Sequence, residues 1–144
     1  MSDSMAKLSF KDCVLGMQAE FSQTITEELV NAFIACSGDY NPIHTDEAYA
    51  SQTPLHGRIT HGMMAAAFFS RMIGMYLPGM FDLYLSQQLN FRKPVYIGDT
   101  VIVRGTITQR TESVHVIRVH TEMIHAVSGE VLVDGDAMVK VRDF

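Results

Sequence analysis

Cysteine is scarce in this sequence of 144 residues, which contains only Cys13 and Cys36 and no CxxC pair. Two thiols in a chain of this size do not make a disulfide framework. The first 25 residues also lack a long apolar stretch behind a basic start, so no secretory signal is expected. These absences together predict a cytoplasmic location.

Long apolar runs are missing as well. The most apolar segment, residues 63–77, is interrupted by Ser70, Arg71 and Gly74, and it is too short to span a bilayer comfortably. Basic residues are also few, because 11 Lys and Arg stand against 16 Asp and Glu and the net charge is −5. This balance argues against nonspecific nucleic-acid binding, although a local basic cluster can still hold an anionic ligand. We therefore predict neither a membrane nor a nucleic-acid partner.

What is present is the composition of an ordinary globular protein. Hydrophobic residues make up 47% of the chain and charged residues 19%. A chain of 144 residues falls in the range of one domain with a sizeable core. Because there is no internal repeat, low-complexity tract or linker, we predict a single domain over residues 1–144.

Hydrophobic periodicity predicts helices early in the chain and strands later. Alternation from Gly16 onward indicates a half-buried strand, and apolar residues at helical spacing follow it. Thr24 and Glu27 have the spacing of a capping box ahead of the first helix, and Gly38 is a typical helix stop. The expected helices cover residues 26–36, 45–51 and 62–76, and the expected later strands cover residues 82–90, 100–108, 113–126 and 130–141.

The expected helix over residues 62–76 is apolar around nearly its whole circumference, which predicts burial on most sides. Its small residues Ala65 to Ala67 would permit close approach by a sheet. Ser128 and Gly129 favour a tight hairpin between the last two strands. A buried helix followed by a long antiparallel sheet predicts an α+β fold with its elements segregated along the chain.

Residues 39–44 combine a carboxylate, a turn and an imidazole. Pro42 pushes Asn41 toward an extended conformation, so these two residues are expected to shape a sharp turn between Asp39 and His44. Such a turn aims both side chains into one space, as proton transfer to and from a small substrate requires. Turn formation alone also accounts for Asp and Asn at such positions. However, an anion beside a helix C-terminus opposes the helix dipole, so Asp39 is a functional candidate.

The segment SGDYNPIH at residues 37–44 resembles the hydratase motif of MaoC-like, R-specific enoyl-CoA hydratases. The likeness continues through RITHGMM at residues 58–64 and FS at residues 69–70, and again through LNFRKPV at residues 89–95 and GDTV at residues 98–101. These blocks, in order, cover most of the chain. The resemblance implies a hot-dog fold, in which a curved antiparallel β-sheet wraps a long buried helix. It also implies a homodimer with the ligand channel near the interface.

The same resemblance implies an (R)-specific 2-enoyl-CoA hydratase, which reversibly adds water to trans-2-enoyl-CoA and yields (R)-3-hydroxyacyl-CoA. It assigns water activation and proton delivery to Asp39 and His44, without dividing acid from base. Gly62 stands at the expected start of the buried helix, where a free backbone N–H is a candidate for oxyanion stabilisation. Ser70 matches a serine that supports the carboxylate or the substrate. A serine bonding back to its own helix is the alternative.

The implied chemistry uses no metal and no redox cofactor, and coenzyme A enters only as part of the acyl-CoA substrate. Three alternatives stay open: a dehydratase for substrates on acyl carrier protein, a hot-dog acyl-CoA thioesterase, and a non-catalytic acyl-CoA-binding module. The spacing of Asp39 and His44 favours hydration over thioester hydrolysis. Arg92 and Lys93 are interpreted as a solvated charge pair at a strand end, with coenzyme A phosphate binding as the alternative.

The remaining histidines do not form an obvious metal site. His115, His120 and His125 fall on one expected strand, where the first and last would lie roughly 33 Å apart. His56 and His61 lack a convincing set of additional ligands. His61 either orients the loop that carries the oxyanion donor or bridges that loop to the rest of the chain.

Overall fold

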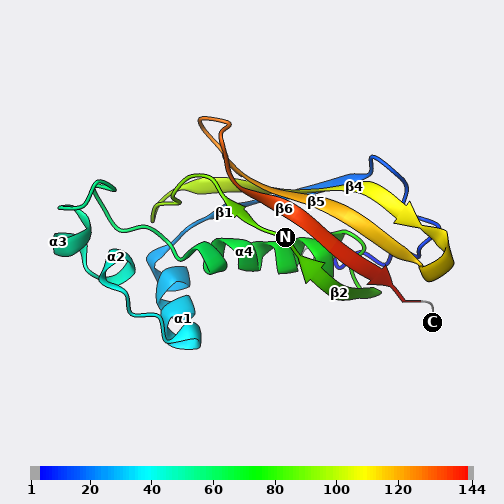
Figure 1. Ribbon diagram of the computed structural model, residues 1–144, viewed down its shortest axis with the longest axis horizontal. Helices are drawn as coiled ribbons and strands as arrows, with labels where there is room; N and C mark the ends of the chain where they lie inside the picture. The colour runs from blue at the N-terminus through cyan, green and yellow to red at the C-terminus, as the bar shows by residue number, and fades with distance from the viewer. Residues whose placement is uncertain (1–3, 143–144) are drawn as a thin grey trace.

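The chain folds as a curved antiparallel sheet with a long helix along one face (Figure 1). A computed structural model describes residues 4–142, and residues 1–3 and 143–144 of the expected domain lie outside the described residues. The elements in chain order are β1 (Gln18–Thr24), α1 (Glu27–Ser37), α2 (Pro42–Thr45), α3 (Glu47–Ala50), α4 (Gly62–Arg71), the π-helical turn η1 (Met72–Tyr76), β2 (Asp82–Gln87), β3 (Asn90–Phe91), β4 (Thr100–Thr111), the 3-10 turn η2 (Glu112–Val114), β5 (Val116–His125) and β6 (Val131–Val141).

The sheet has the strand order β1-β4-β5-β6-β2, and β3 pairs separately with β6. Every strand pairing among the described residues is antiparallel. Along β4, buried residues alternate with less buried ones, as expected for a strand with one face on the core. The register places Val103 opposite Met123 and Ile107 opposite Val119, and all four are buried. The inward residues predicted on these two strands therefore form one core face.

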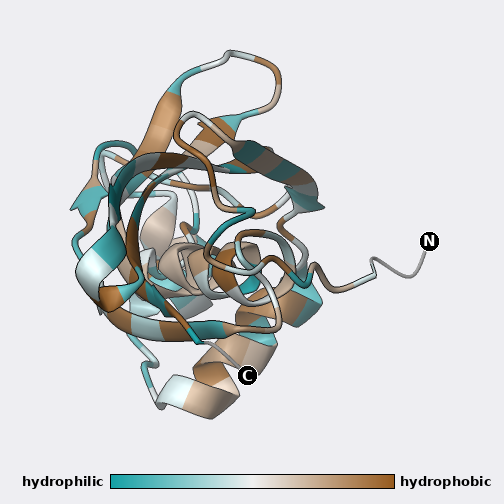
Figure 2. Cartoon of the chain, turned by 90° about the vertical axis from the view of Figure 1, so that its right-hand side faces the viewer, coloured by the Kyte–Doolittle hydropathy of each residue, from teal (hydrophilic) through white to brown (hydrophobic). Residues whose placement is uncertain are grey.

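The long helix lies inside the curve of the sheet (Figure 2). α4 and η1 together span the predicted residues 62–76, and Phe69, Met72 and Ile73 are fully buried. Gly105 of β4 allows close approach, because a Cβ at this position would come within 3.0 Å of the Met72 side chain. A helix wrapped by a curved antiparallel sheet is the hot-dog arrangement, so the predicted α+β hot-dog fold is confirmed.

The long helix has one exposed face and a widened last turn. Among its three consecutive alanines only Ala65 is buried, and Ala67 is exposed. Met63, one turn before Ala67 on the same side, is 60% exposed, so the chain leaves one face of the helix uncovered. The last turn also widens to π geometry, because the N–H of Leu77 donates to the carbonyl of Met72, five residues earlier.

Several element ends differ from those predicted. Thr26, and not Thr24, caps α1, because its Oγ1 accepts the N–H of Leu29. The strand expected over residues 82–90 is interrupted between β2 and β3, beside Gly135 of β6.

Three further expectations about local structure are corrected. The helix expected over residues 45–51 is the shorter α3, and residues 42–45, most of which were expected to form a turn, are the separate helix α2. The β5–β6 connection covers residues 126–130 and is longer than a tight hairpin. His115 precedes β5 with a φ of 49°, so the three histidines do not share one strand.

The three short helical segments α1, α2 and α3 gather at one end of the molecule, next to the N-terminal end of α4 (Figure 1). Across residues 4–142, no helix has both the length and the apolar character that a bilayer crossing requires. The arrangement brings the 39–44 segment to the start of the buried helix, which is where the candidate site forms.

Candidate active site

The end of α1 positions Asp39. Gly38 adopts the left-handed conformation with φ 71°, and its N–H donates to the carbonyl of Ile34 at 2.9 Å. Glycine adopts this conformation without a Cβ penalty, so the helix ends sharply here. The Oδ1 atom of Asp39 accepts the N–H of Asn41 at 3.1 Å. Its Oδ2 atom lies 3.9 Å from Nε2 of His61, and the side chain is 50% exposed.

The short helix α2 positions His44. Asn41 caps it by accepting the N–H of Ile43 at 3.1 Å, and Pro42 occupies the first turn, where a missing N–H costs nothing. His44 therefore lies within the short helix α2, and does not follow an irregular turn as expected. Its Nδ1 donates to the carbonyl of Ile59 at 2.8 Å, since a carbonyl oxygen can only accept. The other ring nitrogen, Nε2, is left to exchange a proton.

Arg58 holds the backbone of His44 in place. Its Nε donates to the carbonyl of His44 at 2.7 Å, and its Nη1 pairs with Oε1 of Glu27 at 2.9 Å. The guanidinium thus links α2 to the start of α1. Sequence reasoning had no signal for this contact, because one acceptor is a backbone carbonyl and the other lies 31 residues away.

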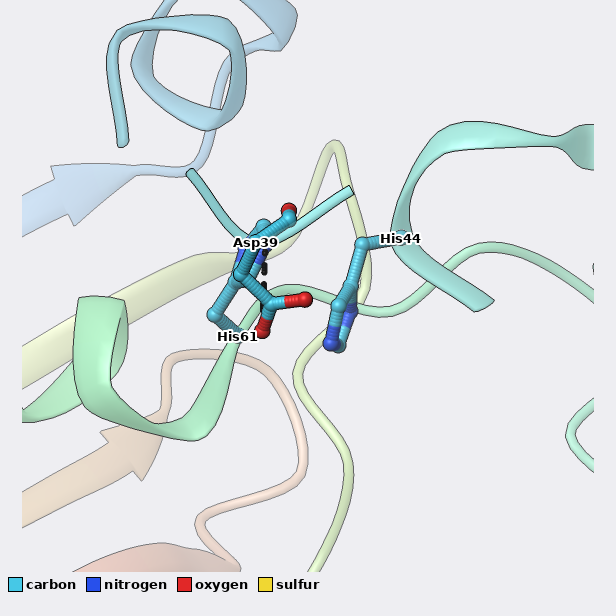
Figure 3. A group of neighbouring side chains, drawn as sticks. All are labelled: Asp39, His44 and His61. Carbon is cyan, nitrogen blue, oxygen red and sulfur yellow. Dashed lines mark hydrogen bonds and ion pairs between the residues drawn. The ribbon is translucent and has the colours of Figure 1, made fainter. Parts of the chain in front are cut away.

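Asp39, His44 and His61 come together beside the start of α4 (Figure 3). One side-chain oxygen or nitrogen from each lies within 4.8 Å of those of the other two. Two atoms that both hydrogen-bond one tetrahedral water at about 2.8 Å are about 4.6 Å apart. The separation therefore suits a single water held between the carboxylate and a ring nitrogen. The structure thus brings Asp39 and His44 together, as the turn hypothesis expected.

His61 is the third member of this cluster, and the sequence left its role open. The residue is 2% exposed, and its Nε2 donates to the backbone carbonyl of Asp39 at 3.0 Å. Its ring stacks on that of His44, with 3.9 Å between the centroids and 29° between the planes. The sequence signal that could have indicated a role for His61 was its position directly before Gly62.

The cluster has the donor types of a metal site, namely two imidazoles and one carboxylate. Each imidazole, however, already donates a ring N–H to a backbone carbonyl. The remaining nitrogen of His61, Nδ1, is buried. An imidazole that donates one ring N–H to a carbonyl can still bind a metal through its other nitrogen, so metal-free chemistry stays a prediction. His120 pairs with Asp136 at 3.2 Å and His125 lies 3.6 Å from Asp99, so these two histidines belong to separate places on the sheet.

A cavity of about 360 Å³ opens beside the cluster. Gly62 begins α4, where a backbone N–H has no partner within the helix and meets the positive end of the helix dipole. A Cβ at Gly62 would come within 2.9 Å of the Phe91 ring, so glycine lets the ring pack against the helix start. Besides His44 and Gly62, the wall includes the apolar residues Leu55, Ile59, Ala65, Phe91, Val95 and Val133.

Ser70 lies apart from this cluster. It is exposed on α4, about 12 Å along the axis from the start of the helix, and it is not part of the cavity wall. The supporting role expected for Ser70 therefore stays a prediction.

Arg92 and Lys93 line the cavity but are engaged with acidic partners. Nε of Arg92 lies 2.6 Å from Oδ2 of Asp134, and Lys93 pairs with Glu130. The hydrogen bond from Arg92 holds the pKa of Asp134 below its usual range. Both basic side chains are about half exposed, at 53% and 51%, which favours the solvated charge-pair interpretation.

Known proteins resemble this chain in sequence and in fold. Residues 13–128 match the family described as MaoC like domain. An (R)-specific enoyl-CoA hydratase of Rhodospirillum rubrum is 36% identical over 140 residues, which cover 97% of this chain and 96% of that protein. A 3-hydroxybutyryl-CoA dehydratase of Methylorubrum extorquens is 37% identical over 141 residues, which cover 98% of this chain and 88% of that protein.

The solved structure of the R-hydratase PhaJ1 from Pseudomonas aeruginosa, in the unliganded form, superposes with a TM-score of 0.91. Its sequence is 33% identical, and the match covers 98% of this chain and 90% of that one. Similarity in sequence and fold thus extends over nearly the whole chain. The chain belongs to the MaoC-like domain family.

Proposed function

We propose that this protein is an (R)-specific 2-enoyl-CoA hydratase, a hydro-lyase that reversibly adds water to trans-2-enoyl-CoA to give (R)-3-hydroxyacyl-CoA. The observation that carries the proposal is the convergence of Asp39 and His44 to within 4.8 Å beside a largely apolar cavity. The two relatives described above are named as a hydratase and a dehydratase, and these names denote the two directions of one kind of reaction.

Hydration forms a C–O bond at C3 and a C–H bond at C2 of the enoyl group. Asp39 and His44 hold the water, and one of them removes a proton as the water oxygen attacks C3. The other delivers a proton to C2, and transfer between the two groups restores the starting state. His44 suits either role because Ile59 holds its Nδ1–H and leaves Nε2 for proton exchange. Such acid–base catalysis contributes about 10²–10⁴-fold.

The backbone N–H of Gly62 stabilises the negative charge that develops on the thioester oxygen. Its position at the start of α4 combines a donor that has no partner within the helix with the positive end of the helix dipole. The apolar cavity wall lowers the local dielectric, so one such donor contributes about 10²–10³-fold. The acyl thioester is thus held with C2 and C3 near the dyad and its oxygen near α4.

Coenzyme A is the carrier in this proposal, and no metal or redox cofactor takes part. The reaction is completed by two protein side chains and one backbone donor, which supports that choice. A cytoplasmic location remains part of the proposal.

The active protein in this proposal is a homodimer. β2 is an edge strand of the sheet, and its free edge can pair with a second copy. Met63 on α4 is 60% exposed, and Leu83 and Leu85 on β2 are each 52% exposed. Exposed apolar side chains on the open face of the long helix and on this edge strand are typical of an interface.

One assay separates hydration from its alternatives. Purified protein is mixed with crotonyl-CoA, and the loss of enoyl absorbance and the release of free thiol are followed independently. Loss of enoyl absorbance without thiol release, with an (R)-3-hydroxy product in chiral analysis, is expected. Thiol release would indicate a thioesterase, and neither signal would leave a binding module. The same substrate on acyl carrier protein tests the carrier.

Two substitutions test the residue assignment. Asp39→Asn and His44→Ala are each expected to lower kcat by about 10²-fold or more while the fold is retained, because each removes one partner of the proton transfer. Asp136→Asn and His120→Ala make the same chemical changes at a carboxylate–imidazole contact on the sheet and serve as matched controls. A folded Asp39 or His44 variant with a near-wild-type rate would overturn the assignment.

A further inference from the structure

We propose that His61 is a positioning residue that holds Asp39 and His44 in register with the backbone donor of Gly62. This inference rests on the proposed function, because it concerns the geometry in which the same dyad and donor act. His61 itself touches no reacting atom in this scheme. It acts through one hydrogen bond, one ring stack and one peptide bond.

The hydrogen bond links His61 to the segment that carries the catalytic carboxylate. The carbonyl oxygen of Asp39 can only accept, so Nε2 of His61 must carry the proton in their 3.0 Å contact. Asp39 has left α1 through the left-handed residue Gly38 and is half exposed, so no helix confines its backbone. The bond from His61 supplies that restraint from across 22 residues of sequence.

The ring of His61 holds the second member of the dyad. It stacks on His44 at 3.9 Å between centroids and also contacts the Phe33 ring of α1 at 4.9 Å. One buried imidazole thus touches side chains or backbone from α1, from the segment after it and from α2. The hydrogen bond to Ile59 fixes the position of Nδ1 of His44, and the stack limits rotation of the ring about that bond.

The backbone of His61 links this assembly to the oxyanion donor. His61 is the N-cap of α4, and its carbonyl accepts the N–H groups of Met64 and Ala65 at 3.1 and 3.2 Å. An N-cap side chain commonly satisfies a free N–H of its own helix, but that of His61 makes no such bond. The side chain bonds Asp39 instead, and the backbone of His61 is joined directly to Gly62.

Packing by itself does not account for a histidine here. Nδ1 of His61 is buried without a hydrogen-bond partner among the described residues, whereas an apolar ring would fill the space without that unpaired atom. A buried polar ring with one nitrogen bonded and the other unpaired is a residue placed against a local rule, which marks a functional position.

Two variants separate positioning from packing. His61→Gln places an amide N–H near the position of Nε2 and can restore the bond to Asp39, whereas His61→Phe keeps an aromatic ring and loses the donor. We expect His61→Phe to lower kcat by about 10²-fold with KM changed less than about threefold, because His61 is not part of the cavity wall. His61→Gln is expected to recover kcat to within about tenfold of the wild type.

A packing role predicts the opposite order, since phenylalanine is the better buried replacement. His61→Phe with a kcat equal to or above that of His61→Gln, both variants being folded, would therefore overturn the inference. The ¹⁵N chemical shifts of histidine-labelled protein give a test that needs no activity: a protonated Nε2 and a bare Nδ1 are expected for His61, and the reverse tautomer would refute the hydrogen bond. Inactive wild-type protein with the expected tautomer would count against the proposed function and leave the link to Asp39 standing.

Discussion

Replacing Gly62 by proline removes one backbone N–H at the first position of α4 and leaves the helix able to form. Proline is favoured at this position, because its fixed φ is helical and the N–H it lacks has no partner within the helix. The residue before proline must be extended. His61 has φ −61° and ψ 135°, so it already meets that requirement. The substitution therefore deletes the donor without demanding a new backbone.

The size of the effect follows from what the donor does. One donor aimed at a developing oxyanion is worth about 10²–10³ in kcat, or about 2.7–4 kcal/mol. Both Gly62→Pro and the control Gly62→Ala add a Cβ that would lie 2.9 Å from the Phe91 ring. This ring is 53% exposed and can move away, so both variants carry a similar steric cost. The ratio of their rates then isolates the N–H.

The assay is the hydration of crotonyl-CoA under saturating substrate, with thermal unfolding measured in parallel. Gly62→Pro is expected to fall about 10²–10³-fold below Gly62→Ala in kcat, and the two should unfold at similar temperatures. A folded Gly62→Pro enzyme within about threefold of Gly62→Ala would refute the oxyanion assignment. A rise in KM with kcat preserved would show that the pyrrolidine ring obstructs binding and that the donor is dispensable.

Two further predictions concern stability. Gly135→Ala is expected to lower the free energy of unfolding by about 3 kcal/mol or more, because the added Cβ would lie 1.7 Å from the backbone oxygen of Gln88. The control Gly129→Ala, with open space and a φ of 74°, should lower it by only about 1–2 kcal/mol in the same urea titration. Equal losses in the two variants would contradict the close contact between Gly135 and Gln88. Because Arg92 holds the folded-state pKa of Asp134 below its usual value, this carboxylate stabilises the fold above about pH 4 and loses that contribution as the pH falls through the lowered pKa. Asp134→Asn should therefore be less stable than the wild type near neutrality, with a gap in urea midpoint that closes in acid, and a gap independent of pH would exclude this linkage.

The sequence determined the fold class and pointed to Asp39 and His44 as the candidate pair. Alternating apolar residues such as Val101 and Val103 mark one face of a strand wherever the strand lies, and apolar positions over residues 62–76 mark a buried helix in the same way. Gly38 and Pro42 act on their own backbone, so the departure from α1 and the convergence of the segment could be inferred from residues 37–44. The strand and helix patterns and the turns at Gly38 and Pro42 depend only on residues near one another in the sequence, so they can be predicted from it.

Only the tertiary structure decided how the pair is held. Arg58 and His61 contact backbone carbonyls that lie 14 and 22 residues away, and every residue type presents the same carbonyl. No pattern of side chains can therefore encode such a partner. The exposed face of α4 could not be predicted either. An apolar residue such as Met63 suits a core and an interface equally well, and only the packing of the strands decides between them.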